Sequence, residues 1–186
     1  RRDKGRGLSD IRHRVVIAGT WDFPFGPGKR FLATGTLSQI LGGWKSNSIV
    51  SMRGGFPFSV GPSGDVCNCA ANAQRAQLVG DPATGFEQAR EKWFNTAAFA
   101  RPVTGRFGNS GRNILNGPGE ATVSFSLFRT IRIKERAKLQ IRSEFFNLFN
   151  RVNFNNPGNT VGTTSYGIIN GASDARIIQF ALKLEF

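Results

Sequence analysis

The most reactive side chains in this sequence are two cysteines, Cys67 and Cys69, which are separated by one asparagine. In an oxidising compartment they can join in a local disulfide, although a one-residue spacer closes a small and strained ring. Free thiols, or thiols paired elsewhere, are the alternative. A metal site would need two further ligands, and the single histidine, His13, lies on a different segment, so we expect no metal.

Groups of residues that could carry out catalysis are missing from the sequence. No Ser or Cys nucleophile motif lies near His13, and the chain has neither a glycine-rich phosphate loop nor a constellation of paired carboxylates. We therefore expect that the chain is not an enzyme and holds no cofactor.

The chain is strongly basic, with 25 Lys and Arg residues against 12 Asp and Glu residues and a net charge of +13. Such a balance suits nucleic acid, anionic lipid or anionic ligands. The charges are spread along the chain, and the densest patch, in residues 1–14, matches no RNA-binding sheet motif, KH loop or helix-turn-helix pattern. We expect no nucleic-acid partner.

Length and composition indicate a single β-rich domain. The chain has 186 residues, with 17 Phe and 23 Gly, and no apolar run approaches the roughly 18 residues of a membrane helix. It does not begin with Met. We therefore expect a piece of a longer protein, whose location the missing targeting segment does not reveal.

Residues 176–186 show the clearest pattern, a strict alternation of apolar and polar side chains. The apolar positions are Ile178, Phe180, Leu182, Leu184 and Phe186. The pattern predicts a strand with one apolar face. It fits a half-buried strand of a soluble sheet, and it equally fits a strand of about ten residues that crosses a bilayer at roughly 45°.

Four further strands are predicted, over residues 14–25, 44–60, 121–134 and 138–149. We expect a bulge or an edge-like irregularity near Gly54 and Pro57 at the end of the second, and a bulge at Phe128 and Arg129 in the third. Residues 134–136 read as a tight polar turn. A helical turn is expected at residues 37–41, and a capping box at Thr84 and Glu87 predicts a short helix that extends to Trp93.

The connections between these strands alternate between short and long. The long ones are residues 61–120 and 150–175. About sixty residues with little regular structure argue against a compact soluble fold, whereas membrane barrels combine long outer loops with short inner turns. The last strand would then end on the periplasmic side.

Several strings, taken in order, resemble the C-terminal end of TonB-dependent outer-membrane receptors, most closely the acidobacterial type that begins with a carboxypeptidase-regulatory-like domain. The strings are Asp10-Ile-Arg-His-Arg14, Trp21-Asp-Phe-Pro-Phe-Gly26, Leu41-Gly-Gly-Trp44, Gly55-Phe-Pro-Phe-Ser-Val60, Trp93-Phe-Asn-Thr-Ala-Ala-Phe99, Phe107-Gly-Asn-Ser-Gly-Arg-Asn113, Glu144-Phe-Phe-Asn-Leu-Phe-Asn150 and the final Phe186.

This resemblance implies an all-β fold of antiparallel up-and-down strands. Residues 1–186 would supply about the last five strands of a transmembrane barrel of about 22, so the sheet would be open in isolation. The implied function is import of a scarce nutrient, such as a siderophore, a glycan or a peptide, across the outer membrane. Two alternatives stay open, a soluble basic all-β binding module and a surface barrel that adheres without transport.

The resemblance also implies partners and residue roles. The partners are outer-membrane lipid, an unknown nutrient ligand, and a plug domain and TonB reached through the missing N-terminal part. The barrel-assembly machinery would read the alternating residues Phe180, Leu182, Leu184 and Phe186. The polar face would line the lumen, either paired with the plug or as a path for an anionic substrate. Its residues include Arg132, Lys138, Arg142, Glu144 and Lys183.

Overall fold

The computed structural model describes residues 4–70, 74–134 and 137–186, so the predicted turn at 134–136 and the start of the basic patch lie largely outside the described residues. The chain forms two compact units. The sheet unit consists of Val15–Met52, Ala121–Val152 and Asp174–Phe186. The loop unit consists of Arg1–Arg14, Arg53–Glu120 and Asn153–Ser173.

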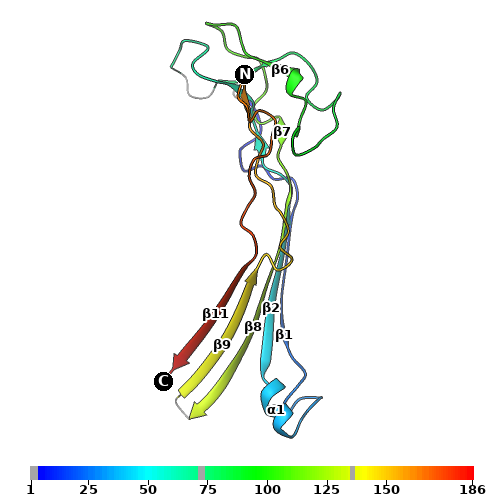
Figure 1. Cartoon of the computed structure of the whole chain (residues 1–186), viewed down its shortest axis with the longest axis vertical. Coiled ribbons are helices and arrows are strands. Elements are labelled where there is room, and N and C mark those ends of the chain that lie inside the picture. The colour runs from blue at the N-terminus through cyan, green and yellow to red at the C-terminus, as the bar shows by residue number, and fades with distance from the viewer. Residues whose placement is uncertain (1–3, 71–73, 135–136) are drawn as a thin grey trace. The chain divides into compact units, whose positions relative to one another are not determined.

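Five long strands form one sheet (Figure 1). They are β1 (Arg14–Asp22), β2 (Trp44–Arg53), β8 (Glu120–Lys134), β9 (Ala137–Phe146) and β11 (Ile177–Glu185). Their order in the sheet, β1-β2-β8-β9-β11, is their order along the chain, and the sheet is not closed. The predicted all-β, up-and-down architecture with an open sheet is therefore confirmed.

The register of the strands places apolar side chains together on one face of the sheet. β9 and β11 are antiparallel, with Ile141 opposite Leu182 and Phe145 opposite Ile178. β8 and β9 are also antiparallel, and Phe125 lies opposite Phe145. Because side chains alternate along a strand, this register gathers the apolar residues of three strands on one side of the sheet.

The same arrangement extends to the first two strands. The Phe23 N–H donates to the Trp44 carbonyl at 3.1 Å, and the Gly54 N–H donates to the His13 carbonyl at 2.9 Å, so β1 and β2 run antiparallel. The Lys45 ammonium lies 3.1 Å from the Asp22 carboxylate, on the face opposite Phe23 and Trp44.

The helical turn predicted at residues 37–41 is confirmed as α1 (Thr36–Leu41). Its last carbonyls have partners from the sheet. Arg129 donates to the carbonyls of Gln39 and Ile40, and the Trp44 indole N–H donates to Ile40 at 3.2 Å. Among the described residues, no helix is long and apolar enough to cross a membrane.

The bulge predicted at Phe128 and Arg129 is wrong with respect to β9. Pairing continues without a shift from Phe125 to Arg132, and the irregularity lies between Arg132 and Lys134. The two residues break the polarity pattern for different reasons. Arg129 lies on the apolar face because it binds α1, and Phe128 lies on the polar face 5.9 Å beneath the Arg142 guanidinium.

Three strands end earlier than predicted. β1 ends at Asp22, two residues before Pro24, which has no N–H to donate. β2 ends at Arg53, and Pro57–Phe58 forms a separate short strand instead of continuing it. β9 ends at Phe146 because Asn147 has a positive φ of 52°, which a strand does not accommodate.

The loop unit is held by three two-residue strand pairs. β3 (Pro57–Phe58) pairs with β7 (Leu115–Asn116), β5 (Gln77–Leu78) with β6 (Phe99–Ala100), and β4 (Gly61–Pro62) with β10 (Thr160–Val161). A 3-10 turn, η1 (Thr96–Ala98), precedes β6. The β4–β10 pair joins the two long connections of the chain.

The loop unit has a hydrophobic core of its own. Its buried members are Phe58, Val60, Ala76, Phe94, Ala98 and Phe99. Phe94 is the centre of an aromatic cluster, with ring centroids 5.8 Å from Phe58, 5.9 Å from Phe99 and 5.5 Å from Tyr166. Residues 61–120, predicted to be irregular, therefore form part of a packed body with very short strands.

The short helix predicted from Thr84 to Trp93 is wrong. Gly85, which would be its first residue, has a φ of 76°. Ala89 and Lys92 instead exchange backbone hydrogen bonds of 3.0 and 3.1 Å. The carbonyl of Thr84 accepts a hydrogen bond of 3.0 Å from the side-chain amide of Asn95, the N-cap of η1. This segment is therefore attached to the 3-10 turn and does not form a helix.

Candidate functional site

The apolar face of the sheet unit is most exposed on the two edge strands, β1 and β11, and is half-buried between them. Phe180 is 75 % exposed and Leu182 is 73 % exposed. The other exposed members on β1 and β11 are Val15, Ile17, Trp21, Ile178 and Leu184. A largely apolar sheet face of this kind is unfavourable in water and suits a lipid environment.

Aromatic residues gather where β1 ends. The rings of Trp21 and Phe23 lie 4.5 Å apart, and Phe25 lies 6.5 Å from Phe23 and 6.2 Å from Phe31. Beside them is an apolar hollow of about 400 Å³, lined by Phe23, Phe25, Ile40, Leu41, Trp44 and Leu127. Aromatic rings at strand ends are typical of the water–lipid boundary of membrane barrels.

The residues predicted to face the lumen share the opposite face of the sheet. Arg132 lies opposite Lys138, Lys138 opposite Glu185, and Lys183 opposite Gln140. Arg142 and Glu144 form an ion pair at 3.0 Å on the same face. The structure therefore gathers all five residues on one side, and their position in the lumen stays a prediction.

The residues predicted to guide assembly lie on the apolar side of β11 and just after it. Phe180, Leu182 and Leu184 alternate with Gln179, Ala181 and Lys183 along the strand. Phe186 follows the strand and is 96 % exposed. Their recognition by the assembly machinery stays a prediction.

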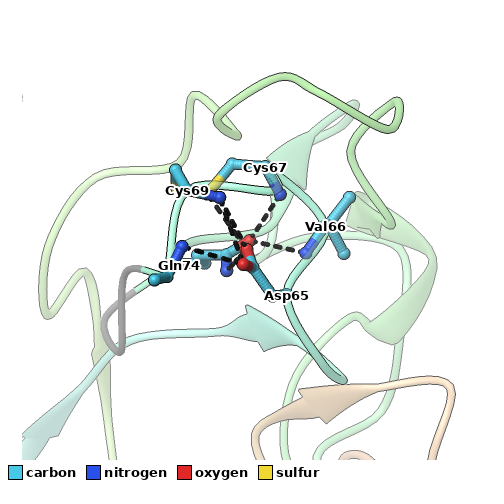
Figure 2. The surroundings of a disulfide bond; sticks show 6 residues. Asp65, Val66, Cys67, Cys69 and Gln74 are labelled. Atoms are coloured by element: carbon cyan, nitrogen blue, oxygen red, sulfur yellow. Dashed lines mark hydrogen bonds between the residues drawn. A yellow bond between two sulfur atoms is a disulfide. The ribbon is translucent and has the colours of Figure 1, made fainter.

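Cys67 and Cys69 form a disulfide in the loop unit, with Cα atoms 5.2 Å apart (Figure 2). The carboxylate of Asp65 lies beneath the ring and accepts N–H groups from Cys69 at 3.1 Å and from Ala70 at 2.8 Å. The Cys67 sulfur, which carries no proton in a disulfide, lies 3.3 Å from the same carboxylate.

Gln74 completes this cluster. Its side-chain N–H donates to Asp65 at 2.6 Å, and its side-chain oxygen accepts the N–H groups of Val66 and Cys67 at 2.9 and 3.0 Å. The Ala70 N–H is the main cause of a lowered pKa of Asp65. Desolvation opposes this effect, and the bonds from Cys69 and Gln74 add to it.

The ligand-type atoms of Asp65, Cys67 and Cys69 all lie within 4.8 Å of one another. Both sulfurs are used in the disulfide, so only the carboxylate is left as a metal ligand. His13 is exposed, and its carbonyl accepts the Gly54 N–H. The structure does not bring His13 into the cysteine cluster.

A second hollow, of about 600 Å³, lies in the loop unit. Its lining is Gln77, Arg101, Pro102, Val103, Gly105, Arg106 and Phe107. Sequence reasoning missed both this hollow and the hydrophobic core of the loop unit. The one available signal was the density of Phe and Trp between residues 56 and 107, which is unusual for a solvated loop.

These features define a class of protein. An open, antiparallel, up-and-down sheet has one exposed apolar face, one charged face and aromatic residues at a strand end, which together describe part of the wall of a membrane β-barrel.

A family model described as an outer membrane beta barrel domain matches residues 1–179. The chain belongs to this family, and its location is the outer membrane. Comparison with curated proteins and with solved structures gives no match. The family assignment removes the soluble-module alternative, because the exposed apolar face lies in an outer-membrane protein.

Proposed function

We propose that this chain is the C-terminal barrel segment of a TonB-dependent receptor that imports a scarce nutrient across the outer membrane. The eight family-like strings between Asp10 and Phe186 support this proposal. The role is transport without catalysis, and the substrate is a siderophore, a glycan, a peptide or another scarce nutrient.

The observation that carries the proposal is the loop unit. Its two long segments are tied by the parallel pairing of β4 and β10 and by a hydrogen bond of 3.2 Å from the Tyr166 hydroxyl to the Thr96 carbonyl. They enclose a buried aromatic core and carry an open hollow. A packed outer body with a hollow suits capture of a ligand better than a set of solvated loops does.

The proposal assigns roles to the parts of the chain. The loop unit captures the nutrient outside the cell. The charged face of the sheet, with Arg142 and Glu144, lines the lumen against a plug domain. TonB and the energised inner membrane act on that plug to open a path. The apolar face contacts outer-membrane lipid, and the assembly machinery recognises Phe180, Leu182, Leu184 and Phe186.

The test is a comparison of three strains of the source organism, the parent, a strain that lacks the gene for this protein and a strain that lacks TonB. Each strain is grown with one limiting nutrient at a time, drawn from ferric chelates, oligosaccharides and peptides. Import predicts at least one nutrient on which both deletion strains fail in the same way and on which the parent grows.

Two outcomes contradict the proposal. Equal growth of the parent and the gene-deletion strain on every nutrient, combined with loss of surface attachment, favours the adhesive barrel instead. Uptake that depends on this protein and is unchanged without TonB refutes the energised mechanism.

A further inference from the structure

The hollow in the loop unit is basic and has no acidic residue in its lining. Two of the seven lining residues are arginines, Arg101 and Arg106, and none is Asp or Glu. Elsewhere in the loop unit, Arg6 is paired with Asp10 and Arg53 with Glu120. No acidic residue of the lining therefore neutralises the positive charge of the two arginines.

The two arginines retain unused hydrogen-bond donors. The guanidinium of Arg101 donates one hydrogen bond, to the neutral Ser63 hydroxyl at 3.1 Å. No side-chain hydrogen bond or ion pair of Arg106 occurs within residues 4–70, 74–134 and 137–186. Since a guanidinium has five N–H donors in a planar fork, both side chains can bind a carboxylate.

The hollow is framed by backbone hydrogen bonds. Its turn is closed by the Arg106 N–H, which donates to the Val103 carbonyl at 3.0 Å, and it is attached to the disulfide segment by the Gly105 N–H, which donates to Val66 at 2.8 Å. On the other side, Gln77 pairs with Ala100 in the β5–β6 pair. The backbone of the lining segments is therefore held in place before any ligand arrives, while the exposed arginine side chains stay open to a ligand.

Close backbone packing next to the hollow supports the same conclusion. Gly108 follows Phe107, and a Cβ atom at Gly108 would collide with the backbone carbonyls of Arg75 and Ala76. The Leu78 N–H donates to the Asn109 side chain at 2.6 Å. The segment after Phe107 is thus packed directly against the strand that carries Gln77.

The chemistry of the lining defines a ligand class. Pro102, Val103 and Phe107 supply an apolar wall, and the two guanidinium groups and the Gln77 amide supply polar contacts. The volume, about 600 Å³, lies in the range of small-molecule sites. We propose that this hollow binds a small organic anion with at least two carboxylates on an apolar framework. This deepens the proposed function, since such an anion would be the nutrient, or the chelating part of it, that the loop unit captures.

The test uses the full-length protein that contains this chain, purified in detergent, and isothermal titration calorimetry. The probe is benzene-1,2,4-tricarboxylate, and the control ligand is its trimethyl ester, which has the same ring and no charge. The variants are the double substitution R101Q/R106Q and the matched control K92Q. Lys92 is a cation of the same unit that is not part of the lining.

We expect the wild-type protein and K92Q to bind the tricarboxylate with similar affinity and to leave the ester unbound. The double variant should bind roughly tenfold or more weakly, because both carboxylate forks are lost. Binding should weaken when the NaCl concentration rises from about 0.05 to about 0.5 M.

Three results would overturn the inference. They are no binding by the wild-type protein, equal binding by the double variant, and an equal loss in K92Q, which would reveal general attraction by the net charge. Intact protease resistance of the double variant shows that it is folded. The import proposal is judged separately by the growth of the TonB deletion strain, so binding without import, or import without binding, identifies which of the two ideas has failed.

Discussion

The Tyr166 hydroxyl donates a hydrogen bond of 3.2 Å to the backbone carbonyl of Thr96, across 70 positions of the chain. The ring of Tyr166 stacks edge-on against Phe94, with centroids 5.5 Å apart. A residue of the second long connection therefore completes the core that the first long connection builds.

This contact predicts an alkaline transition of the loop unit. Burial raises the pKa of Tyr166 to about 12 from its ordinary value of 10.0. The folded state therefore favours the protonated phenol, and this contribution is complete below about pH 10 and is lost as the pH rises through about 12. A difference absorbance titration of wild type against Tyr166→Phe should show tyrosinate forming near pH 12. Formation near pH 10 would contradict the burial of Tyr166.

Phe94→Ala should unfold the loop unit while the barrel wall persists. Phe94 is 2 % exposed and contacts three other rings, so the substitution removes about 3–5 kcal/mol of stability. Limited proteolysis in detergent should show cleavage within residues 57–115. The matched control is Val79→Ala in the same unit, because Val79 is 60 % exposed and should change stability by less than about 0.5 kcal/mol. Equal protease resistance of F94A and V79A would contradict the role of Phe94 in the hydrophobic core.

Asp65→Asn should remove an acid-sensitive step from the disulfide segment. The pKa of Asp65 is lowered in the fold, chiefly by the Ala70 N–H, so its contribution is present above the unfolded pKa of about 3.8 and is lost as the pH falls through the lower folded value. Hydrogen-exchange protection of Cys69 and Ala70, corrected for intrinsic rates, should fall in acid in the wild type and should be weak at every pH in D65N. An acid response of D65N like that of the wild type would show that another group is responsible.

A positive charge introduced on the apolar face should destabilise the barrel, whereas the same charge at the neighbouring residue, which lies on the polar face, should not. Leu127 lies on the apolar face and lines its hollow, whereas the neighbouring Ser126 lies opposite Glu144 on the polar face. Leu127→Lys should cost about 2–4 kcal/mol in lipid, and Ser126→Lys gains a carboxylate neighbour. The readout is the urea midpoint in phospholipid vesicles. Equal midpoints for the two variants would contradict the assignment of the lipid face.

The assembly role proposed for the last strand gives a prediction about yield. Phe186→Ser should lower the amount of protein in the outer membrane several-fold and leave the stability of the assembled fraction close to that of the wild type. Leu139→Ser is the control, because Leu139 lies opposite Leu184 on the same face but in the neighbouring strand β9. Equal losses of yield in both variants would indicate a general packing effect in place of recognition.

The sheet could be predicted from the sequence because each long strand carries its pattern locally. Phe180, Leu182 and Leu184 alternate with polar residues over a whole strand, and membrane contact preserves that period. The misplaced bulge at Phe128 and Arg129 shows the limit of this approach, because Arg129 faces the apolar side to bind the carbonyls of α1, and no local pattern encodes that contact.

The loop unit could not be predicted for the opposite reason. Phe58, Phe94 and Tyr166 meet in its core but come from distant segments, and its strands are two residues long, too short to show any period. The capping box at Thr84 was a genuine local signal, and it was overridden by the positive φ of Gly85 and by the Asn95 amide. The hollow with Arg101 and Arg106 depends on the same long-range packing, so the sequence pattern does not predict it either.

The ion pair between Arg53 and Glu120 has a consequence for how the barrel is assembled. These residues are the last of β2 and the first of β8, and 67 positions separate them. Bringing residues so far apart in the chain together costs conformational entropy. If the loop unit folds first, it offsets that cost before β2 and β8 pair. The loop unit then determines where the pairing of β2 with β8 starts, so mutations in its core should slow insertion even where the mutated residues never touch the bilayer.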